Sequence, residues 1–289
     1  MERELWTRIS KAITAVDRTF PKRHYTHSVG RIVRVYLWAV FKDRPVYWAC
    51  RCENWRGVRP PHTLPHQSRM SRRLKQDDTR QFLREVFARF NPGDQTELLK
   101  FVDGKPLPIS RHSRDSDAAI GRGAGGFDKG YKLHAIYGQS GRLLAWQVHP
   151  LNVDERKTAV KLVKELNDEG YLLGDANYDG NALYAAAKEN GHQLIAPRRY
   201  GTVGQVGHRK HVAARLRGIA LLEGPSDFGR QLHQHRREIE TRFGHLSSFG
   251  GGLTCLPPWV RGLHRVRLYV TAKLLIRATK DAIIRQRAA

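Results

Sequence analysis

Residues 99–104 have the sequence Leu99-Lys100-Phe101-Val102-Asp103-Gly104, in which an apolar run ends at an aspartate and a glycine. A short apolar run that is closed by turn-forming residues predicts a β-strand. The residues before this stretch have the spacing of helices, whereas those after it alternate between strand and helix patterns. The stretch therefore marks the start of an α/β domain.

The residues that follow predict a β-hairpin. Side chains alternate along 131–137, and a second strand pattern covers 143–148. The segment Gly138-Gln139-Ser140-Gly141 lies between them and has the composition of a turn. The glycine-rich residues 121–126 lack the Lys-Ser/Thr ending of a nucleotide-binding loop and follow no apolar strand. We expect them to form a flexible loop between strands.

Helices and strands then alternate to residue 196. The predicted order is a helix from Asp154 to about Leu166, a strand at 171–173 that leads into Gly174-Asp175, a helix at 181–189 and a strand at 193–196. Two further helices, near 229–247 and 262–286, complete the chain. The pattern predicts an α/β domain over residues 96–289, with a mixed sheet flanked by helices.

Residues 1–95 predict a small all-helical domain. One helix face is marked by apolar residues at helical spacing, namely Val29, Ile32, Val33, Tyr36, Leu37, Val40 and Phe41. Residues 64–74 form a short helix opened by proline, and 82–90 are amphipathic. Several helices with one short arginine-rich helix suggest a helix-turn-helix-like module, in which Arg69, Arg72 and Arg73 contact DNA. The alternative is a helical scaffold whose arginines are only solvated.

The charge of the chain is strongly positive and unevenly distributed. The formal net charge is +24, and such an excess attracts phosphate backbones. Residues 1–100 carry 21 basic and 10 acidic side chains, residues 101–197 carry 12 of each, and residues 198–289 carry 18 and 5. A neutral centre between two basic flanks suits carboxylate chemistry between DNA-holding surfaces. A basic protein that binds RNA or ribosomes would share the net charge.

Composition also excludes several classes of protein. No run approaches the roughly 18 apolar residues of a membrane span, and the first residues do not resemble a signal peptide. We therefore expect a cytoplasmic, nucleoid-associated protein without a membrane partner. Cys50, Cys52 and Cys255 have no disulfide-framework or zinc-site spacing, so we expect reduced thiols.

Carboxylates at strand ends are the candidate catalytic groups. Phosphodiester cleavage can use two Mg²⁺ ions about 3.5–4 Å apart, and oxygen ligands hold such ions. Asp103 and Asp175 each follow an apolar strand beside a glycine, and α/β sheets place their chemistry at strand ends. A third carboxylate must come from residues 233–243, where both Glu238 and Glu240 border the apolar seam of a predicted helix.

These segments together resemble the DDE transposases of bacterial insertion sequences, the group with a Tyr-Arg-Glu-Lys signature. The resemblance rests on Val102-Asp103-Gly104-Lys105-Pro106-Leu107-Pro108, Gly174-Asp175-Ala176-Asn177-Tyr178-Asp179 and residues 236–243, and it covers about 99–280. It implies a ribonuclease H-like catalytic domain with the first acid on the first strand, the second on the fourth and a glutamate on a later helix. The Arg-x-x-x-Glu spacing of the signature selects Arg236 and Glu240 over Glu238. The signature tyrosine and lysine positions are His233 and Ser247 here.

The resemblance implies a catalytic triad of Asp103, Asp175 and Glu240 that also binds the metal, which is Mg²⁺ with Mn²⁺ as a possible substitute. It implies metal-dependent cleavage and strand transfer of double-stranded DNA, at the element's terminal inverted repeats and at the target, by a homodimer in the DNA complex. The expected DNA contacts are Arg69, Arg72, Arg73, Arg198, Arg199, Lys210 and Arg236. Two alternatives remain open, an inactive transposase-derived DNA-binding protein and a ribonuclease H-like nuclease that cuts without joining.

Overall fold

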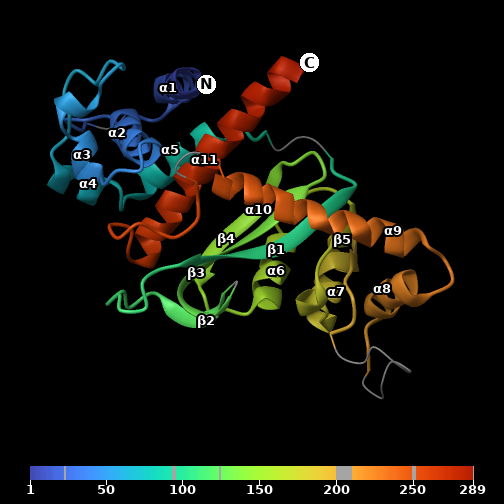
Figure 1. The fold of residues 1–289 in the computed structure, drawn as a ribbon. Coiled ribbons are helices and arrows are strands. Elements are labelled where there is room, and N and C mark those ends of the chain that lie inside the picture. Colours follow the sequence, from blue (N-terminus) through green and yellow to red (C-terminus); the bar gives the residue numbers. More distant parts are fainter. Residues whose placement is uncertain (23, 93–95, 124, 200–209, 249–251, 289) are drawn as a thin grey trace. The chain divides into compact units, whose positions relative to one another are not determined.

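The computed structural model of the chain describes residues 1–22, 24–92, 96–123, 125–199, 210–248 and 252–288 (Figure 1). The chain forms two compact units. Unit 1 comprises Met1–Gly93 together with Leu246–Ala289, and unit 2 comprises Asp94–His245. Unit 2 starts close to the predicted boundary at residue 96, whereas the C-terminal residues group with the N-terminal helices.

Unit 1 is a helical unit. Its helices are α1 (Glu2–Thr19), α2 (Val29–Phe41), α3 (Val46–Ala49), α4 (Gln67–Arg73), α5 (Asp77–Ala88) and α11 (Leu263–Ala288), with a 3-10 turn η1 (Cys52–Asn54). Helix α11 packs on α1, α2 and α5. Asp43, which lies between α2 and α3, links this region to α11. It accepts hydrogen bonds from Tyr269 Oη, at 3.1 Å, and from Lys273 Nζ.

The local sequence explains where the predicted helices begin. Ser28 starts α2, and its hydroxyl accepts a hydrogen bond from Arg31 N. The short arginine-rich helix starts at Gln67 rather than Leu64, because His66 has an extended backbone and its ring accepts from Ser68 N. The N-terminal helical region and the short helix within it are thus confirmed.

Unit 2 is built on one mixed sheet of six strands, β1 (Leu99–Pro108), β2 (Ala119–Gly123), β3 (Gly126–Gly138), β4 (Leu143–Pro150), β5 (Gly170–Leu173) and β6 (His192–Ile195). The strand order is β2-β3-β1-β5-β6, and β4 also pairs with β3. Strands β2, β3, β4 and β1 are joined in antiparallel pairs, whereas β5 is parallel to β1 and β6 is parallel to β5. The predicted fold class, a mixed sheet flanked by helices after a helical region, is confirmed.

The helices of unit 2 cover both faces of the sheet (Figure 1). They are α6 (Glu155–Val163), α7 (Asn181–Glu189), α8 (Ala213–Glu223), α9 (Phe228–Gln234) and α10 (Glu238–Ser248), with 3-10 turns η2 (Ala176–Tyr178) and η3 (His235–Arg237). Val102 and Ile136 point into a core with α6 and α7 side chains. The neighbouring Tyr137 points to the other face, where its ring meets Phe243 of α10 edge-on with centroids 6.0 Å apart.

Three details of the prediction for unit 2 are wrong. The glycines at 121–123 belong to strand β2, since Gly121 lies against Leu151 so closely that a Cβ would meet the Leu151 carbonyl at 2.5 Å. Helix α8 was not predicted, because its apolar residues form no clear stripe along one face. The predicted helix at 229–247 is interrupted by η3.

Candidate active site

Asp103 lies on β1, and Asp175 follows two residues after the end of the neighbouring parallel strand β5. Strand β1 continues beyond Asp103 to Pro108, so this aspartate is not at the strand end that the sequence predicted. It lies instead where β1 leaves β5, since the two strands pair only from Leu99↔Tyr171 to Phe101↔Leu173. Asp103 is two residues beyond Phe101, and Asp175 is two residues beyond Leu173, so the two aspartates lie at the same level where the strands separate.

Asp175 is fixed by its own turn. Its side chain caps η2, with Oδ1 accepting from Asn177 N at 2.8 Å and Oδ2 from Asn177 Nδ2 at 3.1 Å. Gly174 precedes it, and a Cβ there would lie 3.0 Å from the Tyr178 Cβ. The tight turn of Gly174 over Tyr178 therefore sets the direction in which the Asp175 carboxylate leaves the sheet.

Arg236 joins the third candidate acid to the first. One guanidinium nitrogen donates to Asp103 Oδ2 at 3.0 Å, and another donates to Glu240 Oε1 at 2.8 Å. The Arg236 side chain is 18% exposed and the Glu240 side chain 62% exposed. A single cation thus holds two carboxylates that are 137 residues apart in sequence.

Glu238, the competing glutamate, has other partners. Its Oε1 lies 3.1 Å from His235 Nδ1, and its Oε2 lies 3.6 Å from the Arg242 guanidinium. Arg242 in turn donates to Gln139 O at 3.1 Å, in the turn between β3 and β4. Glu238 therefore pairs with His235 and Arg242 rather than with Arg236.

The electrostatics of Asp103 reflect its burial. The pKa of Asp103 is raised to about 6, chiefly by burial and also by the negative charges of Asp175 and Glu155, against the opposing effects of Gly104 N and Arg236. Burial raises the pKa of the Tyr178 hydroxyl well above its usual value. The charges of Glu155, Asp103 and Asp175 also raise it, whereas the charge of Arg236 lowers it. Asp103, Asp175 and Glu155 thus form one electrostatic cluster with the Arg236 cation.

His233 stands at the signature tyrosine position and anchors α9 to the sheet. Its Nε2 donates to Gly174 O at 3.0 Å, directly before Asp175. This contact and the η3 turn that follows bring Arg236 to Asp103 in the middle of β1. Ser247, at the signature lysine position, lies 3.5 Å from Leu253 O.

The sequence did not reveal Glu155 and Lys132 as neighbours of the site. Glu155 is the first residue of α6, and its carboxylate forms an ion pair with Lys132 Nζ. A Cβ on Gly104 would lie 2.9 Å from the Lys132 side chain and 3.1 Å from Glu155 Oε1, so only glycine leaves room beside Asp103. The sequence feature that could have indicated Glu155 is its position in the first turn of α6, the helix that follows the β3–β4 hairpin.

The donor chemistry of the cluster fits a divalent cation. Carboxylate oxygens are the ligands that such ions prefer. The Arg236 guanidinium is a cation already held between Asp103 and Glu240, and the buried Tyr178 hydroxyl has no hydrogen-bond partner among the described residues. Within the same ranges, no three His, Cys, Asp or Glu side chains stand close enough to form a complete metal site.

The expected DNA contacts on α4 differ in exposure. Arg69 and Arg72 are exposed. Arg73 is only 6% exposed, with its guanidinium 3.6 Å from the centroid of the Tyr25 ring and 3.6 Å from Asp78 Oδ2. Arg73 is a packing residue of unit 1, because the spacing of α4 turns it inward, and its burial removes it from the predicted contact surface.

The expected contacts near residue 200 are described only in part. Arg198 forms an ion pair with Glu223 at 2.6 Å, Arg199 is exposed and its backbone N donates to Asp179, and Lys210 is exposed. The remainder of the predicted basic loop, residues 200–209, lies outside the described residues. In the part of the chain that is described, no helix is long and apolar enough to cross a membrane.

The family model described as the transposase DDE domain matches residues 94–277. Among solved structures, the chain is similar to the protein in a cryo-EM structure of the piggyBac transposase synaptic complex with hairpin DNA. The identity is 13%, the TM-score is 0.48, and the match covers 95% of this chain and 71% of that chain. The curated proteins contain no significant match.

Proposed function

The chain belongs to the transposase DDE domain family, and from that membership we propose that it cuts and joins DNA as the transposase of an insertion sequence. The proposed substrates are double-stranded element ends with terminal inverted repeats and a target duplex, held by a homodimer. The single observation that supports this best is the link from Asp103 through Arg236 to Glu240, beside Asp175.

The proposed catalytic residues are Asp103, Asp175 and Glu240, which would also hold Mg²⁺, with Mn²⁺ able to substitute. When bound, the metal activates the attacking oxygen and stabilises the leaving oxygen of the phosphodiester. Asp103 is oriented by Gly104 N, which donates to its Oδ1 at 2.7 Å, and Asp175 is oriented by Asn177. Occupation of the site requires Arg236 to release at least one carboxylate, and the freed guanidinium is then available to a DNA phosphate.

The proposed reaction needs no protein nucleophile. Water attacks the scissile phosphorus, the bond to the 3′ oxygen breaks, and the strand keeps a free 3′-hydroxyl. That hydroxyl then attacks a phosphate of the target, and the displaced target strand leaves with its own 3′-hydroxyl. Each step exchanges one phosphorus–oxygen bond for another, so a covalent enzyme intermediate is unnecessary.

We expect the purified protein to nick and then join DNA that carries the element's ends when Mg²⁺ is present. Chelation with EDTA is expected to stop both reactions, and readdition of Mg²⁺ to restore them, with products resolved on denaturing gels. Binding without any nicking would identify a catalytically inactive DNA-binding protein. Nicking without joined product would identify a nuclease. Either result would overturn the proposed strand transfer.

DNA binding is expected to weaken steeply with salt. Each phosphate neutralised by Lys or Arg adds about 0.9 to the slope of log affinity against log salt, so about six contacts lose about a thousandfold in affinity between 50 and 200 mM salt. Replacing both Arg69 and Arg72 with alanine is expected to lower that slope by about 2. Fluorescence anisotropy across a salt series measures it, with the double replacement Arg3→Ala and Lys11→Ala on α1 as the charge-matched control. An unchanged slope in the double variant would remove α4 from the contact surface.

A further inference from the structure

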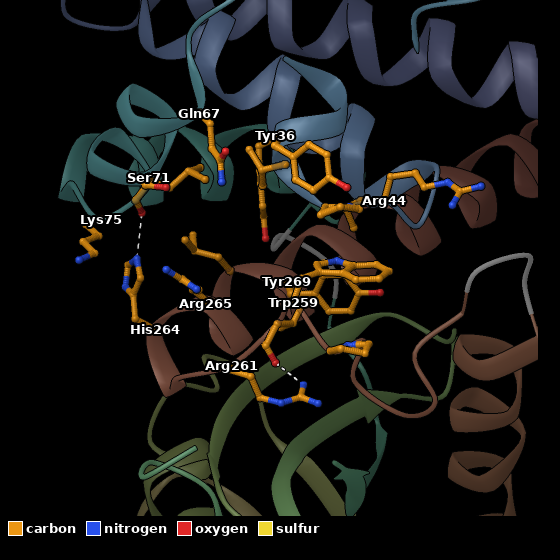
Figure 2. A pocket seen from close by; sticks show the side chains of 18 residues that line it. Tyr36, Arg44, Gln67, Ser71, Lys75, Trp259, Arg261, His264, Arg265 and Tyr269 are labelled. Atoms are coloured by element: carbon orange, nitrogen blue, oxygen red, sulfur yellow. Dashed lines mark hydrogen bonds between the residues drawn. The ribbon is translucent and has the colours of Figure 1, made fainter. Parts of the chain in front are cut away.

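Unit 1 contains a cavity of about 380 Å³ that the proposed chemistry does not use (Figure 2). Such a volume lies within the roughly 300–1,000 Å³ of small-molecule sites. The wall comes from the end of α2, the residues that lead into α3, the α4 region and residues 258–269. None of the described residues that line it is an aspartate or a glutamate.

Four large aromatic side chains line the cavity. Tyr36 and Tyr269 are buried, with 6% and 4% exposure, whereas Trp259 and Tyr47 are 40% and 47% exposed. Tyr269 is fixed by its hydrogen bond to Asp43. The two exposed rings offer flat apolar faces on which another aromatic ring can stack.

Four cations line the same cavity without an acidic partner among the described residues, and one of them, Arg261, donates to backbone carbonyls instead. Arg44, Lys75 and Arg265 are exposed, and none has an ion pair or a side-chain hydrogen bond among the described residues. In the same unit, Arg80 and Arg277 pair with Asp77 and Asp281. In Figure 2, Lys75 and Arg265 lie with His264 on one side of the cavity, and Arg44 lies on the other.

The positive charge acts on the neighbouring histidine. His264 Nε2 donates to Leu74 O at 3.0 Å. Burial lowers the pKa of His264, and the charges of Arg80, Lys75 and Arg265 lower it further. An occupant that carries negative charge would therefore be stabilised here, and a cationic occupant would not.

We propose that this cavity binds one unstacked nucleotide of a DNA strand, with the base against Trp259 and Tyr47 and the phosphate near Arg44, Lys75 and Arg265. A nucleotide combines a flat aromatic ring with an anion, which is the combination that the wall presents. Gln67 and Ser71 of the wall supply neutral hydrogen-bonding groups for the base or sugar. The inference rests on the proposed DNA-binding function. It adds a subsite in unit 1 for an unpaired nucleotide at a strand end or in a single-stranded stretch.

The test uses the full chain and three matched DNA probes. The first is a fully paired duplex, the second is the same duplex with a short unpaired thymidine overhang, and the third carries an abasic overhang of equal length. We expect the thymidine overhang to tighten binding about tenfold over the paired duplex, and the abasic overhang to give much less. The expected gain comes from stacking of the base, which the abasic probe lacks.

Variants of cavity residues test whether the tighter binding of the thymidine overhang arises at the cavity. Trp259→Ala is expected to remove most of the gain from the thymidine overhang while leaving paired-duplex affinity unchanged, and Arg265→Ala is expected to reduce it. Phe127→Ala is the control, because Phe127 is an exposed aromatic residue of unit 2, at 70% exposure. Melting temperature is measured for each variant, and Trp259→Phe, which keeps a ring, is expected to restore part of the gain.

The possible outcomes separate this inference from the proposed function. Absence of binding to every probe would contradict the proposed function itself. Equal binding of paired and overhang duplexes would overturn the nucleotide subsite alone. Equal gain from thymidine and abasic overhangs, or an intact gain in a folded Trp259→Ala protein, would also overturn it. Loss of self-association in Trp259→Ala, with the gain intact, would assign the cavity to a second copy of the chain.

Discussion

Replacement of Asp103 with asparagine is expected to lower the rate of DNA cleavage by about a thousandfold or more, because a carboxylate oxygen that would hold the metal becomes a weak amide ligand. Asp175→Asn is expected to have the same effect. Affinity for element-end DNA is expected to remain unchanged, since neither side chain is a cation that contacts phosphate. Single-turnover cleavage and anisotropy on the same preparations measure the two quantities.

Asp103→Asn is not expected to unfold unit 2. Burial raises the pKa of Asp103 to about 6. A raised carboxyl pKa means that the folded state disfavours the charged form, so a neutral side chain of the same shape does not lower stability above that pH. Asp128→Asn on β3 is the control, because Asp128 lies 3.8 Å from its ion-pair partner Arg111 and has no place in the proposed site. Cleavage by a folded Asp103→Asn protein at the wild-type rate would remove Asp103 from the triad.

The second large effect is expected for the glutamates of α10. Glu240→Gln is expected to reduce cleavage by about a hundredfold to a thousandfold, whereas Glu238→Gln is expected to leave it within about threefold. The reason is the bonding of Arg236, which joins Glu240 to Asp103, while Glu238 pairs with His235 and Arg242. Parallel cleavage time courses of the two variants make the comparison, and both differ from wild type by one amide.

The glutamate pair is a sharp test because both residues lie in the first turn of the same helix. A general effect on α10 would appear in both variants. The reverse order of activities would assign the third acid to Glu238 and would show that Arg236 bonding is a poor guide to the triad. Arg236→Lys gives a further comparison, since a single ammonium cannot reproduce the forked guanidinium that reaches both carboxylates.

Much of unit 2 could be predicted because its strands have clear patterns and short connections. The hairpin of β3 and β4, the helix capped by Asp154 and the strand before Asp175 all lie where the sequence places them. The length of β1 could not be predicted, because residues beyond Gly104 include two prolines and alternate weakly. Lys100, which interrupts the apolar run, is fully buried and forms an ion pair with Asp168 at 3.1 Å, a partner that only the fold reveals.

The candidate site was predicted as single residues but not as an arrangement. The spacing of Arg236 and Glu240 on one helix face was visible in the sequence, whereas the reach of Arg236 to Asp103 depends on η3 and on the His233 contact with Gly174. Glu155 could not be found, because its closeness to Asp103 follows from the register between β1 and β3 and the room left by Gly104. Arg73 was expected to contact DNA but is buried, because composition alone cannot distinguish an exposed arginine from a packed one.

Unit 1 is assembled from both ends of the sequence, and this sets an order on its formation during protein synthesis. Domains generally fold as they leave the ribosome, the N-terminal one first. Here the residues of α1, α2 and α5 emerge early, but α11, which packs on all three, emerges only after the whole of unit 2. The sequence of the proposed catalytic unit is therefore complete while unit 1 still lacks its longest helix. A ribosome-bound chain would hold all three candidate acids before the helical unit that is proposed to contact DNA is complete.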